Sequence, residues 1–290
     1  MLIFYNNLII SFGGSFGQNC VSPDSCFFKS RAPLATTQGN IWAMEWQDQG
    51  IILSSRRHGE TSAVVNILTR SGGMHSGLVR GGWGRRLRHV IEPGNRVHAR
   101  WRGRLSEHLG SYSLEVEHSF SARIMAEPIY LAAMMSALSL SEGSMAEREA
   151  HLKAFDGLSA LLDILDSDAP TAQWQSAYVK WEIGLLGELG YGLDFSKCAA
   201  TGTTENLVYV SPKSGRAVSE SAGEPYKHAM LGLPGFVKEN GGVASSVDDV
   251  VLGLKLTGHF LERHVFNMGG RHLPRARSRF VARISGQKTF

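Results

Sequence analysis

The sequence predicts an α+β protein in two parts, a small β-barrel followed by an α-helical domain. Apolar and polar residues alternate between about Gly50 and Ser119, whereas after Pro128 the apolar residues recur at intervals of about 3.6 residues. At 290 residues and 43% hydrophobic content, the chain is long enough to build two cores. We therefore expect a barrel domain at residues 44–123 and a helical domain at residues 124–290.

The first 43 residues differ from the remainder of the chain. They are rich in glycine, serine, asparagine and phenylalanine, they show no hydrophobic period, and they hold two of the three cysteines, Cys20 and Cys26. Sequence typical of a folded domain begins at Met44. This contrast favours a disordered extension or a start-site artefact for residues 1–43, with a functional tail as the alternative.

Five short strands are expected in the first domain. They cover residues 50–54, 63–69, 74–80, 97–104 and 111–118, and glycine-containing turns separate several of them. Five strands in about seventy residues fit a closed barrel of the oligonucleotide-binding (OB) kind.

The barrel segment is strongly basic. Residues 50–104 contain eleven arginines against two glutamates, although the whole chain carries a formal charge of only +4. Guanidinium groups neutralise phosphates and release condensed counterions, and an aromatic side chain can stack on an unpaired base for about 1–3 kcal/mol. We expect nucleic-acid contacts from a glycine-rich loop and one face of the fourth strand, at Arg80, Trp83, Arg85, Arg86, Arg88, Arg100, Arg102 and Arg104.

Two tryptophans in this segment have different expected roles. Trp101 alternates with Arg100 and Arg102, so it points to the opposite face of its strand and is expected in the core. Trp83 lies inside the loop, where it could stack on a base. The alternative for the loop is a solvated basic surface with Trp83 tucked into the barrel.

The second half of the chain has helical periodicity at residues 129–140, 146–165, 172–189 and 246–266. Residues 195–235 lose this period and are expected to form a small inserted module. After Glu262 the chain has no acidic residue and carries a second basic cluster. We expect this cluster to contact DNA, an acidic partner or the dipole of a preceding helix end, through Arg271, Arg275, Arg277 and Arg279.

A series of short motifs resembles the bacterial RecO recombination-mediator family. The motifs are Gly50–Leu53, Gly59–Ser62, Leu68–Thr69, Gly72–Gly73, Val79–Gly82 and a closing basic element at Gly270–Arg277. Their order and spacing carry the resemblance over about residues 44–285. It implies an OB barrel with a helical domain, in a protein that binds single- and double-stranded DNA and anneals complementary strands. It also implies that the protein helps to load a recombinase onto strands coated with single-strand-binding protein.

The same resemblance implies two protein partners, a ring-forming RecR-like protein and the acidic C-terminal tail of single-strand-binding protein. Some members of the family hold zinc in a four-cysteine module where this chain has residues 195–235. Here Cys198 is the one thiol of the expected four, and His228 does not complete a ligand set. We expect a zinc-ribbon-like module without metal, and no cofactor.

Enzyme and membrane classes find little support in the sequence. Gly13–Gly17 matches the nucleophile-elbow pattern, but no helix-forming segment follows it, and no phosphate-binding loop, zinc-protease motif or dinucleotide fingerprint occurs. We expect no catalytic residues. The absence of an eighteen-residue apolar run and the sparse, odd set of cysteines favour a cytoplasmic protein. The rival functions are an adaptor that recruits acidic protein tails and an OB barrel that binds RNA.

Overall fold

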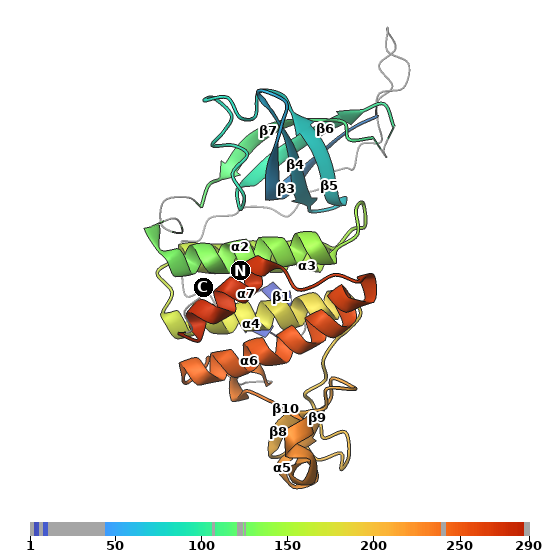
Figure 1. Ribbon diagram of the computed structural model, residues 1–290, viewed down its shortest axis with the longest axis vertical. Coiled ribbons are helices and arrows are strands. Elements are labelled where there is room, and N and C mark those ends of the chain that lie inside the picture. Colours follow the sequence, from blue (N-terminus) through green and yellow to red (C-terminus); the bar gives the residue numbers. More distant parts are fainter. Residues whose placement is uncertain are drawn as a thin grey trace, which may run out of the picture.

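The computed structural model describes residues 3–5, 8–10, 44–105, 108–120, 124, 126–238 and 242–286. A closed five-stranded barrel sits on a helical domain, and a small three-stranded sheet lies at the far end of the helices (Figure 1). This arrangement confirms the predicted α+β class with an N-terminal OB-like barrel followed by helices.

Most of residues 1–43 lie outside the described residues. Within this stretch the structure describes two short strands, β1 (Ile3–Tyr5) and β2 (Leu8–Ile10), which pair antiparallel. The sequence pattern did not predict this hairpin. The boundary expected near residue 123 also lies outside the described residues, because residues 121–123 are not among them.

The barrel strands follow the order β3-β4-β5-β7-β6, and β6 pairs with β3 to close the sheet. They are β3 (Met44–His58), β4 (Ser62–Thr69), β5 (Gly73–Val79), β6 (Arg96–Gly103) and β7 (Ser111–His118). A register shift between Ile52 and Ser54 bends β3, so its first half pairs with β6 and its second half with β4. The sequence predicted only the middle of β3, because only Gly50–Leu53 is buried.

The barrel core is built around Trp101. Its side chain is fully buried, donates its Nε1–H to the carbonyl oxygen of Leu109 at 3.1 Å, and stacks on Trp46 with ring centroids 5.9 Å apart. Gly110 has a φ of +59° and packs directly on the indole, where a Cβ would lie 2.3 Å from a ring atom. The prediction that Trp101 is a core residue is confirmed.

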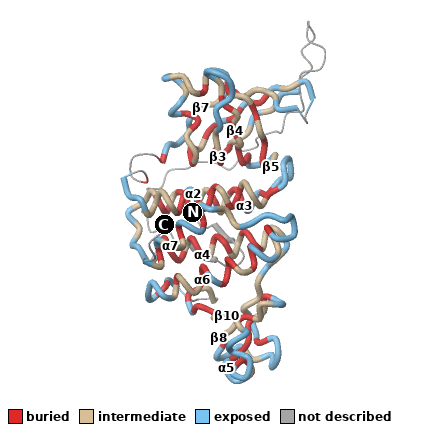
Figure 2. Tube along the Cα trace, viewed as in Figure 1, coloured by how far each residue is buried: buried red, intermediate tan, exposed pale blue. Residues whose placement is uncertain are grey.

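In the part of the chain that the structure describes, five longer helices form the second domain (Figure 1). They are α2 (Pro128–Ser144), α3 (Leu152–Asp166), α4 (Thr171–Glu188), α6 (Val247–Phe260) with a π-helical extension at Leu261–Phe266, and α7 (Arg275–Ile284). Buried residues follow the inward faces of these helices and the interior of the barrel (Figure 2). The first four confirm the expected helical segments, whereas α7 was not predicted.

The inserted module is small. It contains β8 (Leu207–Val210), β9 (Ala217–Ser219) and β10 (Leu231–Gly232) in the order β10-β8-β9, with α5 (Glu220–Gly223) beside them. Within the described residues, no helix is long and apolar enough to cross a membrane.

Charged pairs join the barrel to α3. Arg70 pairs with Asp156 at 3.2 Å, and Arg96 pairs with Asp163 and donates to the Ser159 hydroxyl at 2.9 Å. Two of the eleven arginines in the basic segment are therefore occupied at the contact between the domains.

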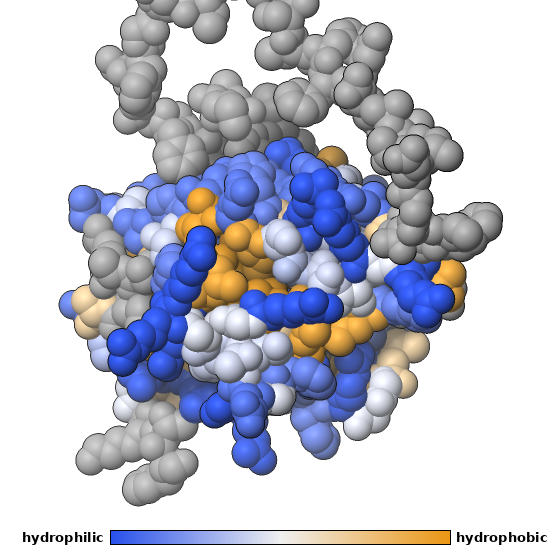
Figure 3. Space-filling view, turned by 90° about the horizontal axis from the view of Figure 1, so that it is seen from above, coloured by the Kyte–Doolittle hydropathy of each residue, from blue (hydrophilic) through white to orange (hydrophobic). Residues whose placement is uncertain are grey.

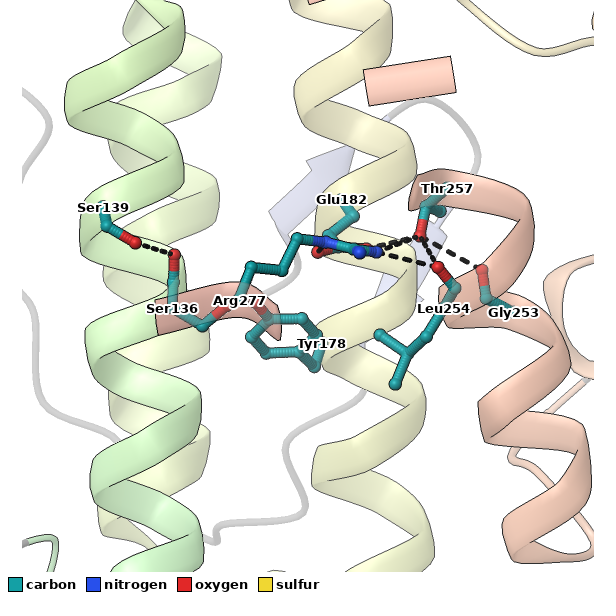
Figure 4. Close-up of polar contacts among 8 residues, drawn as sticks. All are labelled: Ser136, Ser139, Tyr178, Glu182, Gly253, Leu254, Thr257 and Arg277. Carbon is teal, nitrogen blue, oxygen red and sulfur yellow. Dashed lines mark hydrogen bonds and ion pairs between the residues drawn. The ribbon is translucent and has the colours of Figure 1, made fainter. Parts of the chain in front are cut away.

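Helix α7 is held by a buried ion pair. Arg277 is 4% exposed, and its Nε and Nη2 atoms lie 2.7 and 2.9 Å from the carboxylate of the fully buried Glu182 in α4. Arg277 also donates to the carbonyl oxygen of Leu254 in α6 (Figure 4). Burial acts to lower the pKa of Arg277, but the Glu182 carboxylate outweighs this effect and raises it. The positive charge of Arg277, which was expected to contact DNA or a partner, is therefore paired with Glu182 inside the core.

Candidate nucleic-acid interface

The arginine loop, residues 80–95, connects β5 to β6 through consecutive turns. The amide of Arg88 donates to the carbonyl oxygen of Gly84 at 3.0 Å, and that of Ile91 donates to Leu87 at 3.3 Å. These i+4 bonds give the loop a helical pitch locally, although it is not a helix. Residues four apart therefore lie on the same side.

The loop consequently has an apolar side and a basic side. Trp83, Leu87 and Ile91, spaced four apart, pack against the barrel core. The side chains of Arg85, Arg86 and Arg88, which lie between them, are exposed. The apolar side fixes the loop to the barrel, so the arginines are presented on an anchored segment.

In the described structure, the arginines on the basic side of the loop have no acidic partners. Arg80, Arg85, Arg86 and Arg88 are exposed, and none of them forms an ion pair with any residue in the described parts of the chain. Arg88 also makes an aromatic contact, with its Cζ 5.6 Å from the centroid of the Trp83 ring. Four guanidinium groups are therefore available to an anion along one short segment.

Trp83 is half-buried in this arrangement. Its amide donates to the carbonyl oxygen of Thr61 at 2.9 Å, and its indole Nε1 is buried without a hydrogen-bond partner in the described structure. The ring packs on the barrel core, and Arg88 lies over it. A base that stacked on that face would have to displace Arg88. The contacts of Trp83 therefore favour a role in anchoring the loop over a role in base stacking.

Strand β6 has the expected alternation. Val97, Ala99 and Trp101 are buried, whereas His98, Arg100 and Arg102 are exposed. Arg104 follows the end of the strand and is also exposed. One face of β6 therefore does carry basic side chains, as predicted.

The neighbouring strands supply acids to that face. Glu45 in β3 accepts hydrogen bonds from the Nε atoms of both Arg100 and Arg102, the latter at 2.9 Å. The hydrogen bonds from Arg102 and Arg100 lower the pKa of Glu45. In β7, Glu115 lies opposite His98, and Glu117 lies 3.8 Å from the His98 ring nitrogen. The β6 face is thus a mixed surface, in contrast to the arginine loop.

Arg104 differs from the two strand arginines. It makes no ion pair or hydrogen bond with a residue that the structure describes. Within the predicted set, Arg104 therefore belongs electrostatically with the loop arginines and not with Arg100 and Arg102.

Two arginines that the sequence analysis did not assign lie next to the loop. Arg56 and Arg57 are exposed at the end of β3, and the bond from Trp83 to Thr61 brings the β3–β4 turn against the loop. Arg57 also donates to the carbonyl oxygen of Glu60 at 2.9 Å. The antiparallel pairing of β3, β4 and β5 explains this proximity, and a hairpin reading of the sequence could have found it.

The loop between β6 and β7 lies at the same end of the barrel as the arginine loop. The amide of Leu78 in β5 donates to Gly110 at 3.1 Å, immediately before β7. Leu105 and Leu109 in this loop are 49% and 41% exposed. Seen from above, this end of the molecule shows elongated hydrophilic side chains around a small hydrophobic area (Figure 3).

The arginines of the C-terminal basic cluster also differ in whether they are exposed or already bound within the protein. Arg275 and Arg279 are exposed, and Arg271 donates to the carbonyl oxygen of Gly143 at 2.8 Å with its guanidinium over Phe266. Arg277 is buried against Glu182, so its assignment as a partner or DNA contact is wrong. A polyanion cannot reach a guanidinium that is enclosed between α4 and α6.

The inserted module contains a single cysteine, Cys198. Cys198 is 1% exposed, and its sulfur accepts hydrogen bonds from the amides of Ser219 at 3.2 Å and Thr201 at 3.5 Å. Burial acts to raise the pKa of Cys198, but the hydrogen bonds from Ser219 and Thr201 outweigh it and lower the pKa to about 6. No three histidine, cysteine or acidic side chains among the described residues are grouped as metal ligands. A single thiol does not fit a structural zinc, which takes four ligands.

Comparison with known proteins identifies the family. Residues 44–120 match the family described as Recombination protein O N terminal, and residues 125–273 match Recombination protein O C terminal. The chain is 52% identical to the DNA repair protein RecO of Rhodospirillum centenum over 242 residues, which cover 83% of this chain and 94% of that protein. It is 43% identical to the RecO of Rhodospirillum rubrum, over 83% of this chain and 96% of that protein. For the RecO of Mesorhizobium japonicum the identity is 45%, over 83% and 94%. The chain therefore belongs to the RecO family of DNA repair proteins.

Proposed function

We propose that this chain binds the backbones of DNA through the arginine loop and anneals complementary strands. The observation that supports this most strongly is the set of four exposed arginines on an anchored segment, none of them paired to a carboxylate in the described structure. Arg56, Arg57 and Arg104 extend the same positive surface. Arg100 and Arg102 contribute less, because Glu45 already binds both of them.

The mechanism is electrostatic. Each phosphate that a guanidinium group neutralises releases condensed counterions, a favourable term that needs no particular base sequence and weakens as salt rises. Two single strands repel each other through their phosphates, and a concentrated positive surface screens this repulsion. Base pairing then drives annealing, so no covalent step and no catalytic group are required. This account covers both single- and double-stranded DNA, since both present phosphates.

Recombinase loading and the protein partners belong to the same proposal. A protein that pairs strands coated with single-strand-binding protein must act beside that protein, and its acidic tail is chemically complementary to a basic chain. Family membership supports these roles, together with a RecR-like ring protein as partner. They are secondary to the DNA contact, which has direct geometric support in the loop.

A strand-annealing assay tests the proposal. Two complementary labelled oligonucleotides are mixed with the wild type, with Arg85→Ala/Arg86→Ala/Arg88→Ala, or with the matched lysine triple variant. Lysine keeps the charge that the mechanism needs. We expect the wild type and the lysine variant to accelerate pairing, the alanine variant to lose most of this effect, and the acceleration to fade as salt rises.

Two outcomes would contradict the proposal. Unchanged DNA binding and annealing by the alanine variant would remove the loop from the mechanism and favour an adaptor that recruits acidic tails. Stronger competition by duplex RNA than by single-stranded DNA would favour the RNA-binding alternative.

A further inference from the structure

Helix α7 presents a straight row of arginines to solvent. Arg275, Arg279 and Arg283 are four residues apart and exposed, which places them along one side of the helix. The opposite side contains the buried residues of the helix, including Phe280 and Ile284. We call Arg275, Arg279 and Arg283 the α7 stripe; Arg283 was not part of the basic cluster that the sequence analysis singled out.

The orientation of this row is fixed by the core. Arg277 is bound to Glu182 on the buried side, and Phe280 packs on Tyr178 of α4 with ring centroids 4.4 Å apart. Figure 4 shows Arg277 reaching from α7 toward Glu182 in the interior. Because these contacts hold one side of α7 inward, the stripe must face outward.

The charges of the stripe have no partner in the described structure. None of the three arginines forms an ion pair or hydrogen bond with a described residue, and α7 itself contains no acidic residue. Cations near a helix N-terminus oppose the helix dipole, and like charges four residues apart repel each other. The repulsion disfavours the whole row and the dipole disfavours Arg275, whereas the dipole favours Arg283 in the last turn. A bound polyanion would relieve both unfavourable effects.

We propose that the α7 stripe is a second DNA backbone site, separate from the arginine loop. This inference rests on the proposed annealing function and adds where the second strand lies. From Arg275 to Arg283 the helix rises by about 12 Å, over which one strand of DNA carries about three to four phosphates at ~3.4 Å each. Three guanidinium groups, one every ~6 Å along the helix, are close in number to the phosphates on this length.

The surroundings of the stripe fit a nucleic-acid backbone better than an acidic peptide. None of the large hydrophobic side chains that are exposed in the described chain belongs to α7. Peptide docking usually depends on an apolar or aromatic anchor in a pocket, whereas a phosphate backbone needs only spaced positive charge. The stripe offers the second kind of surface.

The location separates the two sites. α7 packs beside α2, and Glu142 of α2 accepts hydrogen bonds from Ser54 and Asn66 in the barrel (Figure 1). Helix α2 therefore lies between the barrel and α7. One protomer then holds one strand at the loop and a second strand on the helical domain. The β6 face is less suited to the second strand, because it contains Glu45, Glu115 and Glu117.

Counting bound oligonucleotides tests this inference. The probe is an oligothymidylate of about 8 nucleotides, within the roughly 4–16 that one OB fold covers. Binding to the full chain is measured by calorimetry for the wild type, for Arg275→Ala/Arg279→Ala/Arg283→Ala, for the matched lysine triple variant, and for the loop alanine variant. We expect two probes per protomer for the wild type and the lysine variant, and one for each alanine variant. In the annealing assay the α7 alanine variant should be slow although it still binds one strand.

Three other results would overturn either this inference or the proposed loop function. If the α7 alanine variant binds as many probes and anneals as fast as the wild type, the inference is overturned while the loop function stands. If the loop variant alone is unaffected, the proposed loop function fails and the α7 site survives. Binding of an acidic peptide that depends on the stripe, with unchanged oligonucleotide stoichiometry, would also overturn the inference. If the α7 alanine triple variant has a lowered melting temperature, Arg279→Ala alone replaces it. This single variant must make the salt dependence of binding at the α7 stripe shallower by about 0.7.

Discussion

The arginine loop and the β6 face contain the same residue type at similar density, yet they differ in what surrounds them. On the loop, the residues that alternate with arginine are apolar and pack on the barrel, so no carboxylate lies beside Arg85, Arg86 or Arg88 in the described structure. On β6, the adjacent strand places Glu45 against Arg100 and Arg102. A basic cluster is therefore a strong candidate anion site only where the neighbouring elements place no acids beside it.

The largest effect is expected where arginine is most enclosed. Arg277→Ala leaves Glu182 as an unpaired buried charge, which should lower the free energy of unfolding by about 3–5 kcal/mol. Urea unfolding measures this loss. The matched control is Arg279→Ala on the exposed side of the same helix, which should change stability by no more than about 0.5 kcal/mol. Equal losses for the two variants would show that Arg277 is not an anchor of α7.

A smaller effect is expected from releasing the arginines of β6. Glu45→Gln removes the carboxylate that binds Arg100 and Arg102, so both become available to phosphates. Single-stranded DNA should bind more tightly, and the logarithmic salt dependence should become steeper by up to about 1.4, at ~0.7 for each new contact. Fluorescence anisotropy at several salt concentrations measures both quantities.

The control for this variant is Glu205→Gln, which makes the same charge change at an exposed position in the inserted module. If it tightens DNA binding as much as Glu45→Gln does, net charge and not release of the strand arginines explains the gain. In that case the contrast between the loop and the β6 face would lose its basis.

The smallest effect concerns the titration of Glu45. Its pKa is held below the ordinary value of 4.5 by Arg102 and Arg100, so this pairing stabilises the fold above pH 4.5 and is lost as the pH falls through the lowered pKa. Arg102→Ala should raise the Glu45 pKa toward 4.5, as followed by NMR of the side-chain carboxyl. Arg104→Ala, which removes an arginine without a contact to Glu45, should leave it unchanged. A Glu45 pKa that does not respond to Arg102→Ala would mean that the pair does not form in solution.

The sequence predicted those features that depend on local periodicity. The alternation of residues 97–104 correctly separated buried Trp101 from exposed Arg100 and Arg102, and the apolar period found α2, α3, α4 and α6. It missed α7, because the buried side of that helix includes an arginine, which reads as a polar position in any hydrophobic pattern.

The rest depended on contacts between distant segments. Glu45 reaches Arg100 across 55 residues and Glu182 reaches Arg277 across 95, and neither pairing follows from spacing in the chain. Local reading could have found one further feature of the site. Trp83, Leu87 and Ile91 repeat at intervals of four, which indicates an anchored loop with an outward basic side.

The DNA-binding role of the loop is tested most directly by two triple variants that remove equal charge. The salt dependence of single-stranded DNA binding is measured for Arg85→Ala/Arg86→Ala/Arg88→Ala and for Arg100→Ala/Arg102→Ala/Arg104→Ala, with melting temperatures to confirm folding. We expect the loop variant to lose about 2 from the logarithmic salt slope, at ~0.7 per contact, and the β6 variant to lose less than half as much. Equal losses, or a larger loss for the β6 variant, would contradict the claim that unpaired loop arginines form the principal DNA contact.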